Sequence, residues 1–203
     1  MTRNPDRFFD LAATTKVNPD DTYIKVYPFL ISYFRDLEKI DEKHVICGAH
    51  MVYGWMPTVL KRMHWNPDTQ EELRIAAKIL NEARQGKLLT QSEVHLLSEL
   101  INNSVVGASK LLHFVSPNLY PIWDSRVYRF IYKKEPYHNA VNNIENYIEY
   151  AEYTRDLALD PKTRAVHEAV EHRLGYTVTK VRAIELIMFL NGAAKKRKKG
   201  NEI

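Results

Sequence analysis

The chain has little cysteine and no long apolar run. Cys47 is its only cysteine among 203 residues, which excludes an internal disulfide and a metal site built from several thiolates. The apolar neighbours Val45, Ile46 and Ala49 predict a small buried side chain here rather than a reactive thiol. No stretch approaches the roughly 20 apolar residues of a membrane span. Residues 1–15 also contain no apolar run suited to a secretory signal, so we expect a cytoplasmic protein that makes no membrane contact.

Several functional motifs are also missing. The sequence contains no phosphate-binding GxxxxGK[ST] or GxGxxG loop and no GxSxG motif of the hydrolases. Residues 167–172, HEAVEH, look like a zinc protease motif, but that motif needs two histidines four residues apart on one helix face. His167 and His172 are five positions apart, so on a helix they point in directions roughly 140° apart. We therefore expect neither a metal site nor a cofactor.

Charge is balanced except at the C-terminus. The chain has 29 basic and 25 acidic residues, and residues 195–203 hold five of the basic and one of the acidic residues, which leaves 24 of each in the rest. The run KKRKK at 195–199 repels itself and can contact phosphates non-specifically. We therefore predict a single helical domain over residues 1–194 and a basic, disordered tail over residues 195–203 that is dispensable for folding.

Charge is also uneven inside the predicted domain. Residues 110–134 contain five basic residues and one acidic residue, whereas residues 135–160 contain six acidic residues and one basic residue. A local basic region attracts anions even when the whole protein is neutral. A helix with a solvated charged face produces the same pattern, so the sequence leaves both interpretations open.

Glycine is scarce, and signals for helix starts recur along the chain. Asn4-Pro5 places a proline at the first position of a helix, and Thr90-x-x-Glu93 is a capping box. No segment alternates apolar and polar residues between turn signals, as a strand would. We therefore predict an all-α fold, an irregular multi-helix globular domain with at least eight helices. The expected helices cover about residues 5–13, 20–39 with a bend or restart at Pro28, 42–54, a shorter piece to 63, 68–85, 90–102, one that begins after Asp124, 139–159, 160–174 and 179–191.

Residues 105–127, VVGASKLLHFVSPNLYPIWDSRV, form the most informative segment. Gly107 is expected to turn the chain into a short helix that carries Lys110 and His113. Two prolines then predict an extended loop that doubles back. Asp124 follows as the N-cap of the next helix, where backbone N–H groups hold a carboxylate ionised and fixed.

This segment resembles the core of the helix-hairpin-helix DNA glycosylases. In that family a glycine-containing hairpin binds a DNA phosphate, and a lysine can follow it as nucleophile. A short proline-containing loop then leads to a catalytic aspartate at a helix N-terminus, often with a valine three residues on. Asp124 and Val127 match the second half of this pattern, whereas Gly107 and Lys110 match the first half only loosely.

The match covers about 25 of the 203 residues and departs from the family pattern in its first half. The family hairpin has two glycines flanking one residue, where this chain has Gly107-Ala108-Ser109. The lysine is out of register with the hairpin, and the loop from lysine to aspartate is several residues shorter. The four-cysteine cluster loop of some members is absent. The resemblance therefore implies a shared local topology more than a shared chemistry.

The resemblance implies an enzyme that excises a flipped nucleobase from DNA. Asp124 would stabilise the oxocarbenium-like sugar cation that forms as the base leaves. Lys110 would attack the sugar carbon and form a Schiff base, which a lowered pKa would assist. An aromatic pocket would hold the flipped base. The candidate substrate-binding residues are Trp123, Tyr120, His113, Arg126 and Trp55.

Each of these residues also has a purely structural interpretation. Aspartate is among the commonest helix N-caps, and aromatic residues near a helix end belong to the core more often than to a ligand pocket. The alternative function is a non-enzymatic helical module that binds nucleic acid or a protein partner through the basic residues 110–134. A helical ribonuclease toxin is a weaker alternative, because the arginine and histidine pair expected of that class is missing. The sequence does not predict the oligomeric state.

Overall fold

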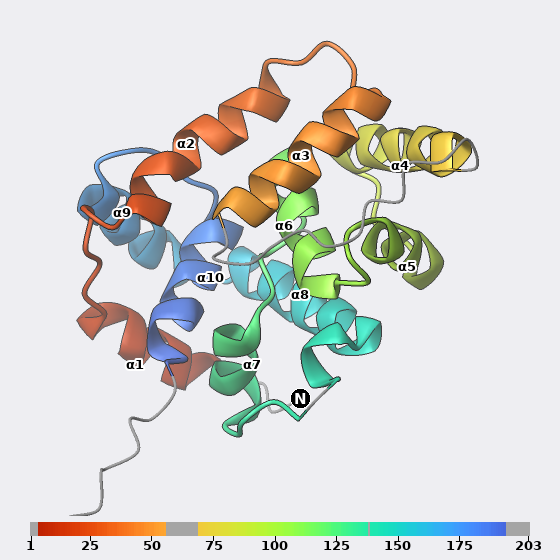
Figure 1. The fold of residues 1–203 in the computed structure, drawn as a ribbon. Helices are drawn as coiled ribbons and strands as arrows, with labels where there is room; N and C mark the ends of the chain where they lie inside the picture. Colours follow the sequence, from red (N-terminus) through yellow and green to blue (C-terminus); the bar gives the residue numbers. More distant parts are fainter. Residues whose placement is uncertain (1–3, 56–68, 138, 194–203) are drawn as a thin grey trace, which may run out of the picture.

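The computed structural model describes residues 4–55, 69–137 and 139–193. In these ranges the chain has ten α-helices, one 3-10 helix and no strand, which confirms the predicted all-α fold class (Figure 1). The predicted helical piece that ends near residue 63 and the predicted tail at 195–203 lie outside the described residues. The α-helices are α1 (Pro5–Thr14), α2 (Thr22–Arg35), α3 (Glu42–Trp55), α4 (Thr69–Arg84), α5 (Gln91–Leu100), α6 (Val105–Val115), α7 (Ser125–Tyr132), α8 (Ile144–Leu159), α9 (Thr163–Leu174) and α10 (Lys180–Asn191).

Side-chain caps fix several of the helix starts that the sequence predicts. Asn4 Oδ1 accepts a hydrogen bond from the backbone N–H of Arg7 at 2.9 Å, and α1 follows with its proline at the first position. The capping box is complete: Thr90 Oγ1 accepts from the N–H of Glu93, and Glu93 Oε2 accepts from the N–H of Thr90. Thr179 caps α10 with its hydroxyl. The predicted capping box and the two predicted helix starts near Asn4 and Thr179 are confirmed.

One predicted helix start is wrong, and of the two alternatives predicted at Pro28, a bend or a restart, the restart does not occur. α8 begins at Ile144 rather than after Asn139, because a short 3-10 helix, η1 (Ala140–Asn142), comes first. α2 runs from residue 22 to residue 35 with Pro28 inside it and does not restart there. Buried residues on both sides of this proline pack both halves of α2 against the core, which offsets the backbone hydrogen bond that proline removes.

The predicted burial of Cys47 is also wrong, because this side chain is exposed. Val45 and Ala49 lie one helical turn apart and are both buried. Cys47 is two positions from each of them, which on a helix is about 200° around the axis. The thiol therefore faces away from the core although its sequence neighbours are apolar.

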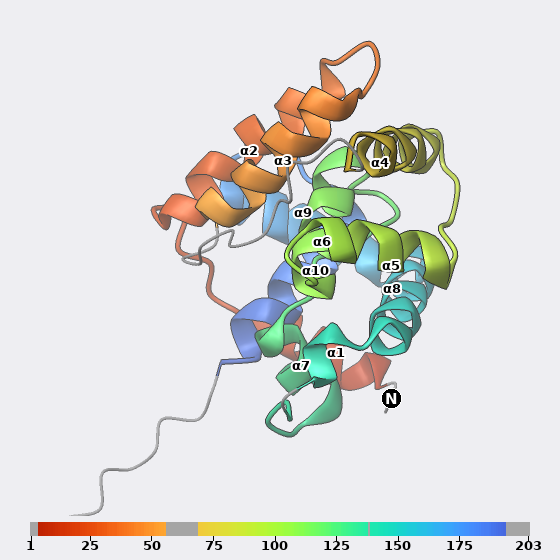
Figure 2. The same cartoon turned by 45° about the vertical axis from the view of Figure 1, so that its right-hand side comes forward.

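Two buried helices organise the fold, each with its own set of neighbours. α6 packs against α2, α3, α4 and α5, whereas α10 packs against α1, α7, α8 and α9. Figures 1 and 2 show the α2–α3 pair across one end of the molecule and α1 and α7 toward the other end. The candidate site lies at the boundary between the two sets of helices.

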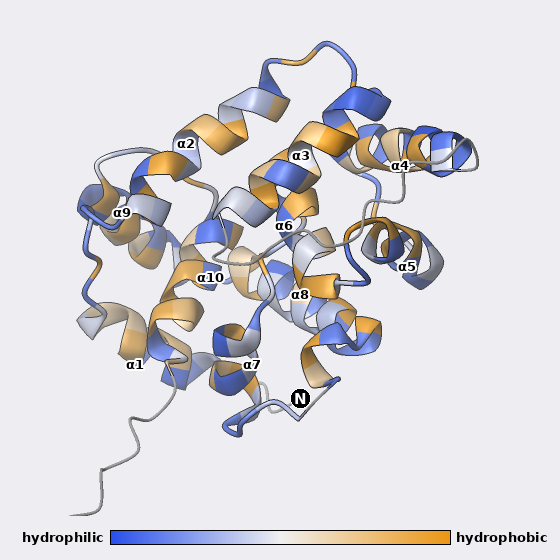
Figure 3. Cartoon of the chain, in the orientation of Figure 1, coloured by the Kyte–Doolittle hydropathy of each residue, from blue (hydrophilic) through white to orange (hydrophobic). Residues whose placement is uncertain are grey.

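Hydropathy follows this arrangement (Figure 3). α4 carries hydrophobic residues on one side and hydrophilic residues on the other, as a helix at the surface should. α10 is instead buried over its whole middle, residues 181–188. Two of these buried residues, Arg182 and Glu185, are charged. Since an isolated buried charge is costly, these two side chains require partners.

Candidate active site

The loop between α6 and α7 returns along the side of α6, as the sequence predicts. The backbone N–H of Trp123 donates to Ser109 Oγ at 3.1 Å, a contact between residues 14 positions apart. Ser109 and Trp123 each stand one residue before a predicted catalytic residue. This hydrogen bond therefore brings the backbones of Lys110 and Asp124 near each other.

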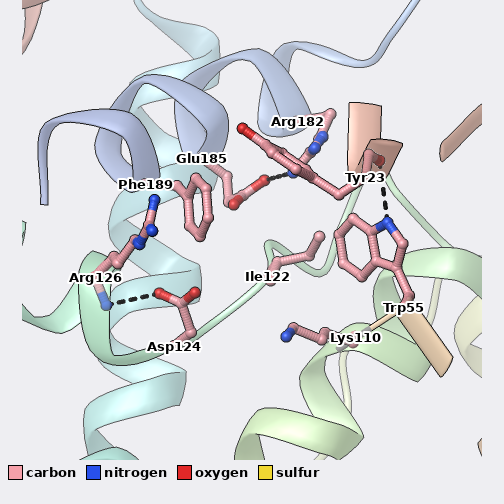
Figure 4. Close-up of a pocket in the computed structure, with 9 residues that line it drawn as sticks. All are labelled: Tyr23, Trp55, Lys110, Ile122, Asp124, Arg126, Arg182, Glu185 and Phe189. Carbon is pink, nitrogen blue, oxygen red and sulfur yellow. Dashed lines mark hydrogen bonds and ion pairs between the residues drawn. The ribbon is translucent and has the colours of Figure 1, made fainter. Parts of the chain in front are cut away.

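Asp124 is the N-cap of α7, which confirms the prediction. Its Oδ1 accepts hydrogen bonds from the backbone N–H groups of Arg126 and Val127, both at 2.9 Å. No described residue donates to the second oxygen, Oδ2, and Figure 4 shows the carboxylate extending into a pocket. One oxygen of Asp124 thus serves the helix while the other remains available to a ligand.

The first half of the glycosylase-like segment does not form a glycine turn, so that prediction is wrong. Gly107 lies inside the first turn of α6, where its N–H donates to Oγ of the N-cap Ser104 at 3.0 Å. A Cβ at Gly107 would lie 2.7 Å from Cγ2 of Ile101. Close packing of α6 against the end of α5 therefore explains the glycine.

A cavity of about 290 Å³ opens between the two sets of helices (Figure 4). Its apolar walls are three aromatic rings and one isoleucine, and five charged side chains from α6, α7, α10 and the α7 N-cap complete it. Both predicted catalytic residues, Lys110 and Asp124, line this cavity. The lining residues are Tyr23, Trp55, Lys110, Ile122, Asp124, Arg126, Arg182, Glu185 and Phe189.

Lys110 is a buried lysine whose amine points into the cavity (Figure 4). Its Nζ lies 5.5 Å from the centroid of the Trp55 ring, and no described residue accepts a hydrogen bond from it or forms an ion pair with it. Burial lowers the pKa of Lys110 to about 8, although the carboxylates of Asp124 and Glu185 act in the opposite direction. An uncharged, nucleophilic amine is therefore accessible close to neutral pH.

Glu185 and Arg182 are site residues that the sequence interpretation missed. Both are almost fully buried, and Arg182 Nη1 donates to Glu185 Oε2 in an ion pair. The guanidinium also lies 4.5 Å from the centroid of the Tyr27 ring. Burial raises the pKa of Glu185 to about 7, against the opposing effect of Arg182. Figure 4 shows the second carboxylate oxygen of Glu185 directed away from Arg182 and toward the cavity.

The sequence did contain a signal for this pair. The α10 sequence KVRAIELIMFL is apolar on every side, which indicates a buried helix. Arg182 and Glu185 interrupt it three positions apart, where side chains on a helix can meet. Two opposite charges at this spacing in an otherwise apolar helix therefore indicate a buried ion pair.

Two of the five predicted substrate-binding residues line the cavity. Trp55 forms one wall, and its indole N–H donates to the backbone carbonyl of Tyr23 at 3.0 Å, which fixes the ring. Arg126 is exposed, and its guanidinium lies 4.5 Å from the centroid of the Phe189 ring at the rim. Both side chains are held in place by neighbouring aromatic residues.

The other three predicted substrate-binding residues do not line the cavity. Trp123 is fully buried, and its indole donates to the carbonyl of Val141 at 2.9 Å. His113 is fully buried between the carbonyl of Tyr120, at 2.7 Å, and the hydroxyl of Tyr27, at 2.9 Å. Burial lowers the pKa of His113 to about 3, so this imidazole stays neutral. The Tyr120 hydroxyl donates to the backbone carbonyl of Lys87 and accepts from the N–H of Leu89 at 3.1 Å, so all three side chains form buried hydrogen bonds within the protein.

No other cluster in the described part of the chain suggests a metal. Among the described residues, no three His, Cys, Asp or Glu side chains lie close enough together to hold a metal ion. His167, part of the rejected zinc-like segment, has its Nε2 2.7 Å from the carbonyl oxygen of Val178. Among the helices described, none is long and apolar enough to cross a membrane.

Comparison of the chain with protein-family models, with curated proteins and with solved structures finds no match. The chemistry of the cavity therefore has to follow from its own residues.

Proposed function

We propose that this chain is an enzyme that cleaves the bond between a nucleobase and its sugar in DNA. The observation that supports this most strongly is the meeting of Lys110 and Asp124 in one cavity with aromatic walls. The cavity volume, about 290 Å³, is at the lower end of the range for small-molecule sites. A single flat heterocycle stacked beside Trp55 fits that size and those walls.

The two predicted catalytic residues have complementary roles in such a reaction. Oδ2 of Asp124 faces the sugar and stabilises the positive charge that develops at its C1′ carbon as the base leaves. The uncharged amine of Lys110 attacks the same carbon. A bond from nitrogen to C1′ forms while the bond from C1′ to the base breaks, and the base takes that electron pair.

Glu185 supplies the proton that the departing base requires. Its raised pKa keeps a protonated fraction near neutral pH. The carboxylate that results can take back the proton that the Lys110 nitrogen loses after attack, so protons balance over the step. Asp124 and Glu185 are thus two carboxyl groups with different environments, and such a difference separates a charge stabiliser from an acid.

The second candidate function is a non-enzymatic module that binds nucleic acid. It is favoured over the glycosylase by the position of Gly107 inside α6, because residues 105–109 are helical and do not form the hairpin that binds phosphate in that family. In this case the Arg182–Glu185 pair and the Asp124 cap are structural features.

The test is base excision from a panel of short duplexes, each carrying one damaged or mismatched base. We expect the wild type to release a base from at least one duplex and Asp124→Asn, which keeps the cap, to fold normally but lose this activity. Lys43→Ala, at an exposed position on α3, is the control that should stay active. If the wild type releases no base but binds these duplexes, the module is the correct function.

A further inference from the structure

A second cleft lies at the other end of α7. It has a volume of about 570 Å³ and is formed by the α7 C-terminus, the following turn, α1 and the end of α10. Four of its side chains are cationic and one is anionic. We call it the α7 cleft; its lining residues are Arg7, Arg129, Phe130, Lys133, Lys134, Glu135, Asn191, Gly192 and Ala193.

The positive charge of the α7 cleft is only partly balanced. Its single lining acid, Glu135, is paired with Arg129, with Oε2 2.7 Å from Nε. Lys133 and Lys134 are exposed, and neither forms an ion pair with a described residue. Two neighbouring lysines without ion-pair partners in a concave surface attract anions.

An exposed aromatic ring stands beside these lysines. Tyr137 is 63% exposed, and Lys134 Nζ lies 5.9 Å from the centroid of its ring. Basic side chains interleaved with an accessible aromatic ring are typical of surfaces that follow a nucleic-acid backbone and stack on its bases. An acidic protein segment would use the lysines but would gain little from this ring.

The α7 cleft and the cavity share two helices. Asp124 caps one end of α7 in the cavity, and Lys133 caps the other end in the cleft. Lys133 follows Asp124 by nine positions, and a helical rise of about 1.5 Å per position separates these ends by roughly 13 Å. That length corresponds to about four nucleotides at the 3.4 Å rise of one DNA strand. α10 makes the same connection, because Glu185 lies in the cavity and Asn191 in the cleft.

We propose that the α7 cleft binds the phosphodiester backbone of a DNA strand about four nucleotides from the nucleotide that enters the cavity. This inference rests on the proposed function in naming DNA as the substrate. The contact is sequence-independent, because lysines hold phosphates as point charges and do not read base edges.

The experiment measures binding of a short fluorescent duplex that contains one tetrahydrofuran abasic analogue, from about 50 to 200 mM salt. This analogue lacks the aldehyde, so it reports binding without chemistry. Lys133→Ala/Lys134→Ala should reduce the slope of log K against log salt by about two and weaken binding roughly tenfold or more at the lower salt. The control double variant, Lys39→Ala/Lys43→Ala, should match the wild type. It changes two exposed lysines, one in the α2–α3 connection and one in the first turn of α3, at the opposite end of the molecule from α7.

A single substitution separates binding from folding. Lys133 has a left-handed backbone with φ of 56°, which glycine adopts without steric cost. Lys133→Gly should therefore keep or raise the melting temperature while it lowers the salt slope by about one. Weaker binding of this variant cannot be attributed to a damaged fold.

Each outcome decides one proposal. Equal salt slopes for the two double variants overturn the α7 cleft inference, and base excision by the wild type then still supports the proposed enzyme. A reduced slope without any excision supports the cleft and contradicts the enzyme. A competition experiment compares poly-glutamate with unlabelled DNA. If poly-glutamate displaces the duplex from the wild type at a lower concentration of charge than DNA does, and Lys133→Ala/Lys134→Ala abolishes this displacement, the cleft binds protein and the inference is overturned.

Discussion

The two ends of α7 hold charged groups in opposite environments. At the N-terminal end, the cavity buries Lys110, Arg182 and Glu185 to 7%, 2% and 1% exposure. At the C-terminal end, Lys133 and Lys134 project from an open cleft. A buried charge has lost its hydration, so its protonation depends on the neighbouring groups. An exposed charge keeps its hydration and attracts partners through a field that salt screens.

Because of this difference, the two regions suit different functions. Proton transfer and nucleophilic attack need groups whose pKa the protein can shift, and the cavity provides two of them, Lys110 and Glu185. Association with a polyanion needs many solvated charges and tolerates the loss of any single one. Substitutions in the cavity should therefore alter stability and chemistry, whereas those in the α7 cleft should alter only binding.

The largest effect should come from breaking the buried ion pair. Glu185→Ala leaves Arg182 as an unpaired buried charge, so it should lower the free energy of unfolding by about 3–5 kcal/mol. The double variant Arg182→Met/Glu185→Leu removes both charges and should be far less destabilised. Urea denaturation monitored by circular dichroism measures both. Equal destabilisation in the two variants would show that shape rather than charge matters at these positions.

The pH dependence of stability should also report Glu185. Its pKa is about 7 in the folded protein against 4.5 for the free side chain, so the folded state binds this proton more tightly. The stabilisation from this proton is complete below about pH 4.5 and is lost as the pH rises through about 7. Lys110 has the opposite sign in a higher window, since its pKa of about 8 lies below the usual 10.5 and stability rises with pH between these values.

Glu185→Gln isolates this contribution. The variant cannot titrate, so the fall in stability between about pH 4.5 and 7 should become shallower than in the wild type. The groups that face Glu185, namely Arg182, Asp124 and Lys110, remain in place. Melting temperatures across this range are the measurement, and parallel wild-type and variant profiles would contradict the shifted pKa.

Asp124 should show a smaller effect on folding and a large effect on function. Asp124→Ala removes both hydrogen bonds at the start of α7 and should cost about 1 kcal/mol of stability. Asp124→Asn preserves the cap and should cost a few tenths at most, because asparagine caps helices about as well as aspartate. Base excision should nevertheless fall on the order of 100-fold or more in Asp124→Asn, since only a negative charge stabilises the developing cation. Activity retained in Asp124→Asn would reduce this residue to a cap.

The smallest effect on stability belongs to the α7 cleft. Lys133→Ala/Lys134→Ala changes two exposed residues and should shift the free energy of unfolding by no more than about 0.5 kcal/mol. A loss of several kcal/mol in thermal or urea unfolding would show that these lysines belong to the folded core, and the contrast between the two regions would fail.

The sequence predicts the helices and one half of the candidate site. Caps such as Thr90 with Glu93, and Asp124 before α7, act within a few residues, so they can be recognised locally. The approach of Lys110 to Asp124 depends on the Ser109–Trp123 hydrogen bond across a loop. A doubling-back loop was predictable from its prolines, but that contact was not.

Three of the predicted substrate-binding residues lie outside the cavity for a tertiary reason. Trp123, Tyr120 and His113 have side chains that suit either a ligand or a buried hydrogen bond, and only the packing of the α6–α7 loop selects the second. Glu185 and Arg182 were missed because α10 lies more than fifty residues from the glycosylase-like segment. Their spacing indicates a buried ion pair, but their place beside the cavity follows from the packing of α10 against α7.

The central claim, that Lys110 and Asp124 form a reactive pair in one cavity, has a direct test. A duplex containing a natural abasic site exposes an aldehyde, and borohydride converts a Schiff base between it and a lysine into a stable adduct. Peptide mapping by mass spectrometry should place this adduct on Lys110, with a yield that rises as the pH approaches about 8 and its amine loses a proton. An adduct spread over exposed lysines, or one that forms equally in Lys110→Ala, would contradict the account.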